Sequence, residues 1–132
     1  MADDSNSTPT ARLTAIRGPL LELHRTLLES ERRLYEIAHG RVTPGELLTL
    51  ALKDQQFAWL HQLSAIIVRI DELVAGDTPP SEADLRSVVT ELRALLTPSA
   101  TGTWLEQRYD RAIQNDPAVL LAHRSMMSAL RS

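Results

Sequence analysis

The sequence predicts an all-α protein, and three observations support this fold class. Its 132 residues are rich in Leu, Ala, Arg and Glu but include only one Phe, two Trp and two Tyr, which favours helix over sheet. Residues 57–74 are apolar around more than half of a helical wheel, as expected for a helix that is buried on most sides. Patterns that cap and end helices recur between the apolar segments.

The first helix is expected over residues 10–39, where apolar side chains follow a seven-residue repeat with a gap at Ser30. The members of this repeat are Leu13, Ile16, Leu20, Leu23, Leu27, Leu34 and Ile37. Pro19 lies inside the pattern and lacks a backbone donor. We therefore expect a kink or break near residues 15–19, or a helix that starts at Pro19. Gly40 is a natural C-terminal stop.

A central helix, about residues 55–75, is expected to follow a short helix of about residues 44–52. Residues 43–46, Thr-Pro-Gly-Glu, have the form of a capping box and predict the start of the short helix. Asp54 is the expected cap of the central helix, and the chain either breaks or only bends there. Polar side chains interrupt the apolar run, so it cannot span a membrane. They are His61, Gln62, Arg69, Asp71 and Glu72.

Turn and cap residues divide the remainder of the chain into further helices. Residues 76–80 form the clearest turn, and Ser81 opens the next helix in the same capping style. Thr97-Pro98 ends that helix, because the residue before proline disfavours the helical region. Another helix is expected from Thr103 to near Asn115.

The last helix is expected to resume after a break at Asp116-Pro117, which is a cap followed by proline at the first helical position. The predicted architecture is therefore four-helix-bundle-like, with a short extra helix before the central helix and a break in the last helix. By length it is one domain, over residues 10–132. Residues 1–9 are expected to form a disordered lead-in, because they are polar and acidic.

Composition and charge exclude several classes of function. The formal net charge is −3 with both signs mixed along the chain, so no basic block suggests a nucleic-acid partner. The absence of Cys excludes disulfides, zinc thiolate sites and a Cys nucleophile. The N-terminal residues MADDSNSTPT do not resemble a secretory or transit signal, so a cytoplasmic location is expected by default.

Four polar residues fall inside the apolar arcs of their helices and are expected to face the interior. They are His24, Glu31, Asp71 and His123. Arg17 shares the arc of the first helix and is a possible counter-charge. Buried polar groups need partners, so these residues are expected to meet one another, the backbone, water or a ligand.

Three interpretations of these residues remain open from the sequence. They form a polar network that fixes helix register, they line a pocket for a small ligand or ion, or they make a metal or catalytic site. A di-iron site is poorly supported, because the spacing Glu-x-x-His occurs once, at Glu36 and His39. Ser64 shares the arc of the central helix, where a small packing residue is the ordinary interpretation. No cofactor is predicted.

Three segments resemble a family of small bacterial helical proteins without an assigned function. They are LLELHRTLLESERRLYE, TPGELLTLALKDQQFAWLHQLSAIIVRIDEL and RYDRAIQNDPAVLLAH, and the most specific part is FAWLHQLSAIIVRIDEL. The resemblance covers most of the chain from about Arg17. It implies a helical fold and a bacterial, cytoplasmic protein, and it implies no activity.

The leading functional expectation is a non-enzymatic protein that acts through protein–protein contacts as a homodimer. It depends on the apolar arc of the central helix, which is broader than one small bundle is expected to cover, and on the lack of a strong catalytic motif. The alternative is a bundle that binds a small ligand or metal ion through His24, Glu31, Asp71 and His123, with Arg17 beside them. An enzyme is the least favoured class.

Overall fold

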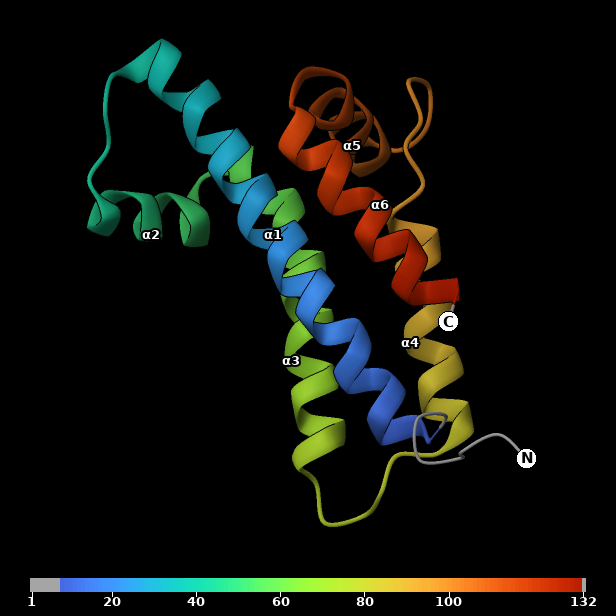
Figure 1. Cartoon of the computed structure of the whole chain (residues 1–132). Helices are drawn as coiled ribbons and strands as arrows, with labels where there is room; N and C mark the ends of the chain where they lie inside the picture. The colour runs from blue at the N-terminus through green and yellow to red at the C-terminus, as the bar shows by residue number, and fades with distance from the viewer. Residues whose placement is uncertain (1–7, 132) are drawn as a thin grey trace.

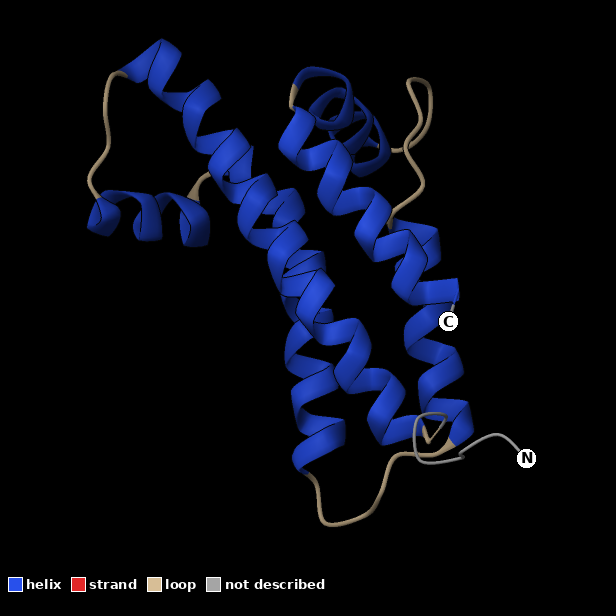
Figure 2. Ribbon diagram, viewed as in Figure 1, coloured by secondary structure: helices blue, strands red, loops and turns tan. Residues whose placement is uncertain are grey.

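The computed structural model of the chain describes residues 8–131, and these form helices joined by loops without any strand (Figures 1 and 2). The all-α prediction is confirmed for this part of the chain. The helices are α1 (Pro9–His39), α2 (Pro44–Lys53), the 3₁₀ helix η2 (Gln55–Leu60), α3 (His61–Ala75), α4 (Glu82–Leu95), α5 (Trp104–Asn115) and α6 (Pro117–Arg131). Most of the expected lead-in lies outside the described residues, while Thr8 caps α1 and Pro9 is its first residue.

The first helix, α1, runs without interruption through Pro19. The prediction of a break or a new start at this proline is therefore wrong. Pro19 leaves the carbonyl of Ala15 without its helical donor, and Ala15 is exposed, so water can take the place of that donor. Buried Ile16 and Leu20 on either side hold the helix against the core. Gly40 ends α1 with φ 86°, a conformation that favours glycine.

The predicted capping residues occupy the helix starts. Thr43 and Glu46 form a reciprocal capping box at α2, and Ser81 and Asp84 form one at α4. A third capping box, not distinguished in the sequence, joins Thr103 and Glu106 at α5. Each box satisfies two backbone N–H groups that a helix start would otherwise leave without partners. Local sequence therefore determines where these helices begin.

The central segment begins as a 3₁₀ helix and continues as an α-helix. Asp54 caps it as expected, accepting the backbone N–H of Gln56 at 2.8 Å. The tighter turn over Gln55–Leu60 places Phe57, Trp59 and Leu60 together in the interior. The short helix α2 precedes this segment and packs against it. The chain therefore breaks at residue 54 and does not bend there within one long helix.

The buried apolar side chains form one core, to which every helix except α2 contributes fully buried residues. The largest contribution from α1 is Leu13, Ile16, Leu20, Leu23 and Leu27. These residues face the central segment, α4 and α6, since α1 packs against each of those elements. Figure 1 shows α1 as the long diagonal helix that passes between α3 and α6. The best-connected element is thus α1, and α3 packs beside it.

The last part of α1 extends beyond this core. Figure 1 shows the chain leaving the end of α1 and turning back through α2, while α5 and α6 lie on the other side of α1. The repeat that fills the core continues here to Leu34 and Ile37, yet these side chains are 47% and 83% exposed. The end of α1 therefore lies between two structures, α2 on one side and the α5–α6 corner on the other.

Candidate functional site

Glu31 is the one candidate residue that the structure places fully inside, with 3% of its surface exposed. Arg108 of α5 donates to both of its carboxylate oxygens, at 2.8 and 2.7 Å. The side-chain amide of Gln56 in η2 donates to the same carboxylate at 2.9 Å. Glu31 thereby joins α1, η2 and α5, and its charge is compensated as a buried charge must be.

Arg17 and Asp71 are the two candidate residues that contact each other. The Arg17 guanidinium donates from Nε to Oδ1 of Asp71 and from Nη2 to Oδ2 at 3.2 Å. This hydrogen bond lowers the pKa of the Asp71 carboxyl. The expectation that Asp71 is interior is wrong, since its side chain is 48% exposed, and that of its partner Arg17 is 40% exposed. The neighbouring residues Ile16 and Ile70 are buried, so the pair lies at the edge of the contact between α1 and α3 and links the two helices at the surface.

His24 pairs with Ser64 across the contact between α1 and α3. The distance from His24 Nε2 to Ser64 Oγ is 2.9 Å, and both residues are half-buried. The Ser64 hydroxyl is also within hydrogen-bond distance of the carbonyl oxygen of Leu60, at 3.2 Å. No carboxylate among the described residues orients the second nitrogen of His24, so the pair is a helix contact.

His123 pairs with Tyr109, which joins α6 to α5. The Tyr109 hydroxyl lies 2.5 Å from His123 Nδ1, and the two rings meet edge to face. Burial raises the pKa of Tyr109 above its usual range and lowers the pKa of His123. Both groups are therefore neutral at physiological pH, as suits a hydrogen bond at the edge of an apolar core.

The candidate residues thus take separate partners. Arg17 and Asp71 meet each other, whereas Glu31, His24 and His123 each pair with a residue outside the candidate set. Over residues 8–131, no group of three or more His, Asp or Glu side chains is placed to hold a metal ion. The arrangement therefore matches the first interpretation of these residues, a set of polar contacts that fixes the helices against one another.

A concave site that the sequence analysis missed lies between α1 and α5, and we call it the arginine groove. It is a cavity of about 220 Å³. It is lined by Ser30, Glu31, Arg33, Leu34, Arg108, Arg111, Ala112, Asn115, Asp116 and Pro117. Three guanidinium groups and two carboxylates lie along this lining, so charged groups dominate its chemistry.

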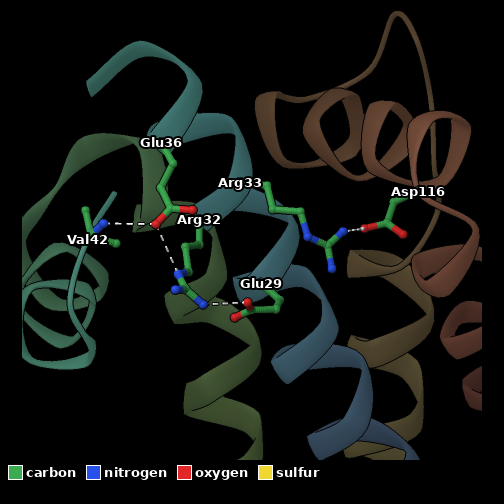
Figure 3. Close-up of polar contacts among 6 residues, drawn as sticks. All are labelled: Glu29, Arg32, Arg33, Glu36, Val42 and Asp116. Carbon is green, nitrogen blue, oxygen red and sulfur yellow. Dashed lines mark hydrogen bonds and ion pairs between the residues drawn. The ribbon is translucent and has the colours of Figure 1, made fainter. Parts of the chain in front are cut away.

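An ion pair crosses the arginine groove where α5 meets α6. Figure 3 shows Arg33 reaching from α1 to Asp116, and its Nη1 donates to Oδ2 of Asp116 at 3.0 Å. Asp116 is buried, and its other carboxylate oxygen accepts the backbone N–H of Ala118 at 3.0 Å. Asp116 therefore caps α6 and anchors Arg33 at the same time.

The opposite side of α1 is tied to the chain that leads into α2. Arg32 donates to Glu29 at 2.7 Å and lies 3.5 Å from Glu36. Glu36 in turn accepts the backbone N–H of Val42 at 2.9 Å. Figure 3 shows this chain of contacts on one side of α1 and Arg33 on the other. The end of α1 is thus held in place even though its apolar residues are uncovered.

Helical spacing on α5 was the signal that could have indicated the arginine groove. Trp104, Arg108, Arg111 and Asn115 recur at intervals of three or four residues, so they lie on one face of α5. The Arg108 guanidinium lies 6.0 Å from the centre of the Trp104 ring, within reach of a cation–π interaction. The spacing alone does not show that this face is turned toward Glu31 of α1.

Four exposed apolar side chains belong to the end of α1 and to α2. They are Leu34, Ile37, Leu48 and Leu52, and we call them the α1–α2 apolar residues. Leu48 and Leu52 are each 63% exposed and lie one helical turn apart, on the face of α2 away from Leu50. Large apolar groups left uncovered on rigid helices are typical of surfaces that bind other proteins.

The geometry defines the class of this molecule as an all-α protein with an arginine groove and uncovered apolar residues at one end. Comparisons with protein-family models, with curated proteins and with solved structures gave no match to the chain. The resemblance to small bacterial helical proteins therefore stays an expectation. No helix in residues 8–131 is both long enough and apolar enough to cross a membrane.

Acidification below about pH 6.5 is expected to reduce the free energy of unfolding. Burial lowers the pKa of His24 and His123 from the ordinary value of 6.5. The unfolded chain then takes up protons at a higher pH than the folded chain. The stabilisation that these two uncharged histidines give to the folded state is fully present above pH 6.5, and it is lost as the pH falls toward their lowered pKa values. Urea unfolding of the protein between about pH 7.5 and about pH 5 measures the loss.

The double variant His24→Gln, His123→Gln is the control for this loss of stability. Its free energy of unfolding should change much less over the same interval. The carboxyls of Asp71 and Glu46 have pKa values below their ordinary 3.8 and 4.5, so their stabilisation is lost only at lower pH. Identical pH profiles for the double variant and the unaltered chain would contradict the assignment to these two histidines.

Proposed function

We propose that this chain is a non-enzymatic, cytoplasmic protein that acts through protein–protein contacts and forms a homodimer. The observation that carries this function is the exposure of the α1–α2 apolar residues. Leu34 and Ile37 continue the repeat that fills the core, but within residues 8–131 their side chains stay 47% and 83% exposed. A second copy of the chain is the occupant, because one two-fold contact covers the same residues on both copies.

The central helix no longer provides the basis for a dimer. Most of its broad apolar arc is covered within the chain by α1 and α4, and among its larger side chains Val68 and Val74 are the exposed ones. The surplus apolar surface lies at the end of α1 and on α2 instead. A contact made there leaves the core of each copy intact, so dimer formation and folding can be measured separately.

The polar surroundings favour a defined contact over unspecific association. Arg33 and Arg32 lie on opposite sides of the end of α1, and each is fixed by an ion pair. Uncovered apolar side chains with charged side chains beside them are the usual composition of a protein interface. Because the charged side chains are already ordered, association loses less conformational entropy.

The double variant Ile37→Asp, Leu48→Asp is expected to be a monomer. Each substitution would place a carboxylate in the apolar contact without a partner, and we expect the dimer dissociation constant to rise at least about tenfold. Size-exclusion chromatography with light scattering measures the molar mass. The unaltered chain should approach twice its 14.7 kDa, whereas the double variant should stay near that mass.

Leu121→Asp is the matched control, because Leu121 of α6 is 65% exposed and outside the α1–α2 apolar residues. This variant should remain dimeric, and circular dichroism should show that all three proteins are equally helical. An unaltered chain that is monomeric over the whole micromolar range would refute the dimer. Loss of the dimer in Leu121→Asp alone would show that the contact lies on α6.

A further inference from the structure

The arginine groove carries more positive than negative charge. Its lining has three guanidinium groups, from Arg33, Arg108 and Arg111, and two carboxylates, from Glu31 and Asp116. Arginine keeps its charge at any physiological pH. Each carboxylate accepts a hydrogen bond from a guanidinium, Glu31 from Arg108 and Asp116 from Arg33. The formal net charge of the five groups is one positive unit.

Neither carboxylate of the groove is free to neutralise the third arginine. Glu31 receives two hydrogen bonds from Arg108 and one from Gln56. Asp116 uses one oxygen to cap α6 and the other to bind Arg33. Arg111 is thus the arginine of the groove that has no hydrogen bond or ion pair with any of residues 8–131.

The position of Arg111 differs from that of an ordinary surface arginine. It lies on the wall of a concave site, on the same face of α5 as Arg108 and across the groove from Arg33. Two of the three guanidinium groups are fixed by their ion pairs, so the positive field is already organised before anything binds.

We propose that the arginine groove binds a small oxyanion, the carboxylate or phosphate group of a small molecule, with Arg111 as its principal contact. A planar guanidinium can donate two parallel hydrogen bonds to either group. The cavity of about 220 Å³ is smaller than the pockets of about 300–1,000 Å³ that hold drug-sized ligands, which suits a compact anion. Leu34 and Ala112 provide an apolar wall for the carbon part of such a molecule.

Leu34 belongs to both surfaces, but the oxyanion site depends on Arg111 of α5, whereas the dimer is tested at Ile37 and Leu48, so separate substitutions test the two proposals. Inorganic phosphate and acetate are the two probes, each titrated into the full chain at constant ionic strength made up with sodium chloride. Two-dimensional ¹H–¹⁵N NMR of the backbone amides measures binding. Shifts are expected in residues 30–34 and 111–118 with saturation, which gives a dissociation constant for each probe.

Arg111→Gln is expected to raise the dissociation constant of the bound anion at least about tenfold, because the substitution removes the charge and the paired donors. Arg124→Gln is the matched control: Arg124 is exposed on α6, outside the groove, and has no polar partner in residues 8–131. Arg124→Gln should bind like the unaltered chain. Arg111→Lys keeps the charge but not the paired donors, so its affinity should fall in between.

The two probes separate the sources of the oxyanion. Saturation by phosphate alone assigns the groove to phosphorylated molecules, saturation by acetate alone assigns it to carboxylates, and saturation by both shows that the groove accepts either oxyanion. Equal weakening in Arg111→Gln and Arg124→Gln would overturn the site, since it would show an unspecific response to charge. Shifts centred on Arg86 and Arg93, which line a separate cavity on α4, would overturn it as well.

Discussion

Replacing Glu31 by alanine is expected to lower the free energy of unfolding by about 3–5 kcal/mol. Glu31 is the buried carboxylate that holds Arg108 and Gln56, and the Arg108 side chain is only 19% exposed. Removal of the carboxylate leaves a positive charge near the interior without its counter-charge. That penalty is a large part of the roughly 5–15 kcal/mol that stabilises a domain of this kind. Urea unfolding followed by circular dichroism measures the change.

Two further variants identify the origin of that effect. Glu22→Ala alters the same residue type on the same helix, but Glu22 is exposed and pairs with Arg25 at the surface, so we expect little change. The double variant Glu31→Met, Arg108→Met removes both charges and should recover most of the stability lost in Glu31→Ala. A double variant as unstable as Glu31→Ala would show that packing, and not the unpaired charge, is responsible.

Replacing Trp59 by alanine is expected to cost a similar amount, about 3–5 kcal/mol, because the substitution leaves a large cavity in the core. Trp59 is 1% exposed and lies in the 3₁₀ segment that opens the central helix. Val68→Ala in α3 is the control, since Val68 is 55% exposed, and its effect should stay within about 0.5 kcal/mol. Equal effects of both substitutions would contradict the central position of this segment.

A second substitution at Trp59 concerns the indole nitrogen. Trp59 Nε1 is buried and has no hydrogen-bond partner within the described part of the chain. A buried donor without a partner destabilises the folded state, and Trp59→Phe removes that donor together with some of the packing. Trp59→Phe should therefore be clearly more stable than Trp59→Ala. If the two are equally unstable, a phenyl ring cannot fill the space that the indole occupies in the core.

The fold class and the helix starts could be predicted from the sequence because both depend on local chemistry. Thr43, Asp54 and Ser81 cap helices through side-chain contacts with residues two or three positions ahead. The break predicted at Pro19 is absent because distant contacts outweigh a local penalty. The penalty of a proline is local, whereas the packing of Ile16 and Leu20 that outweighs it comes from distant parts of the chain.

Helical periodicity placed side chains on a face but could not show where the core ends. Leu27 and Leu34 belong to one repeat, yet Leu27 is buried and Leu34 is not, because α1 is longer than the core beside it. A helical wheel describes directions around an axis and contains no information about position along it. Asp71 lies at the surface for a different reason, since its neighbour Ile70 is buried: the buried arc of α3 is narrower than its arc of apolar residues, as the exposed Val68 also shows.

The partners of the interior polar residues could not be predicted, because each lies far away along the chain. Glu31 was correctly placed inside, but its partner Arg108 is 77 positions further on. The Arg33–Asp116 ion pair spans 83 positions. The arginine groove depends on both contacts, so it exists only once α5 has docked on α1. A single sequence provides the spacing on each helix and says nothing about which faces will meet.

The packing of α1 against α6 has a consequence for the order of events during synthesis. During synthesis α1 leaves the ribosome before α6. The contacts between α1 and α6 join segments far apart in sequence, so they cannot form until α6 has been made. Until residues 117–131 emerge, one apolar side of α1 has no cover in the nascent chain. A truncated product that lacks this last helix would therefore be prone to aggregate, even though every earlier helix retains its own capping signals.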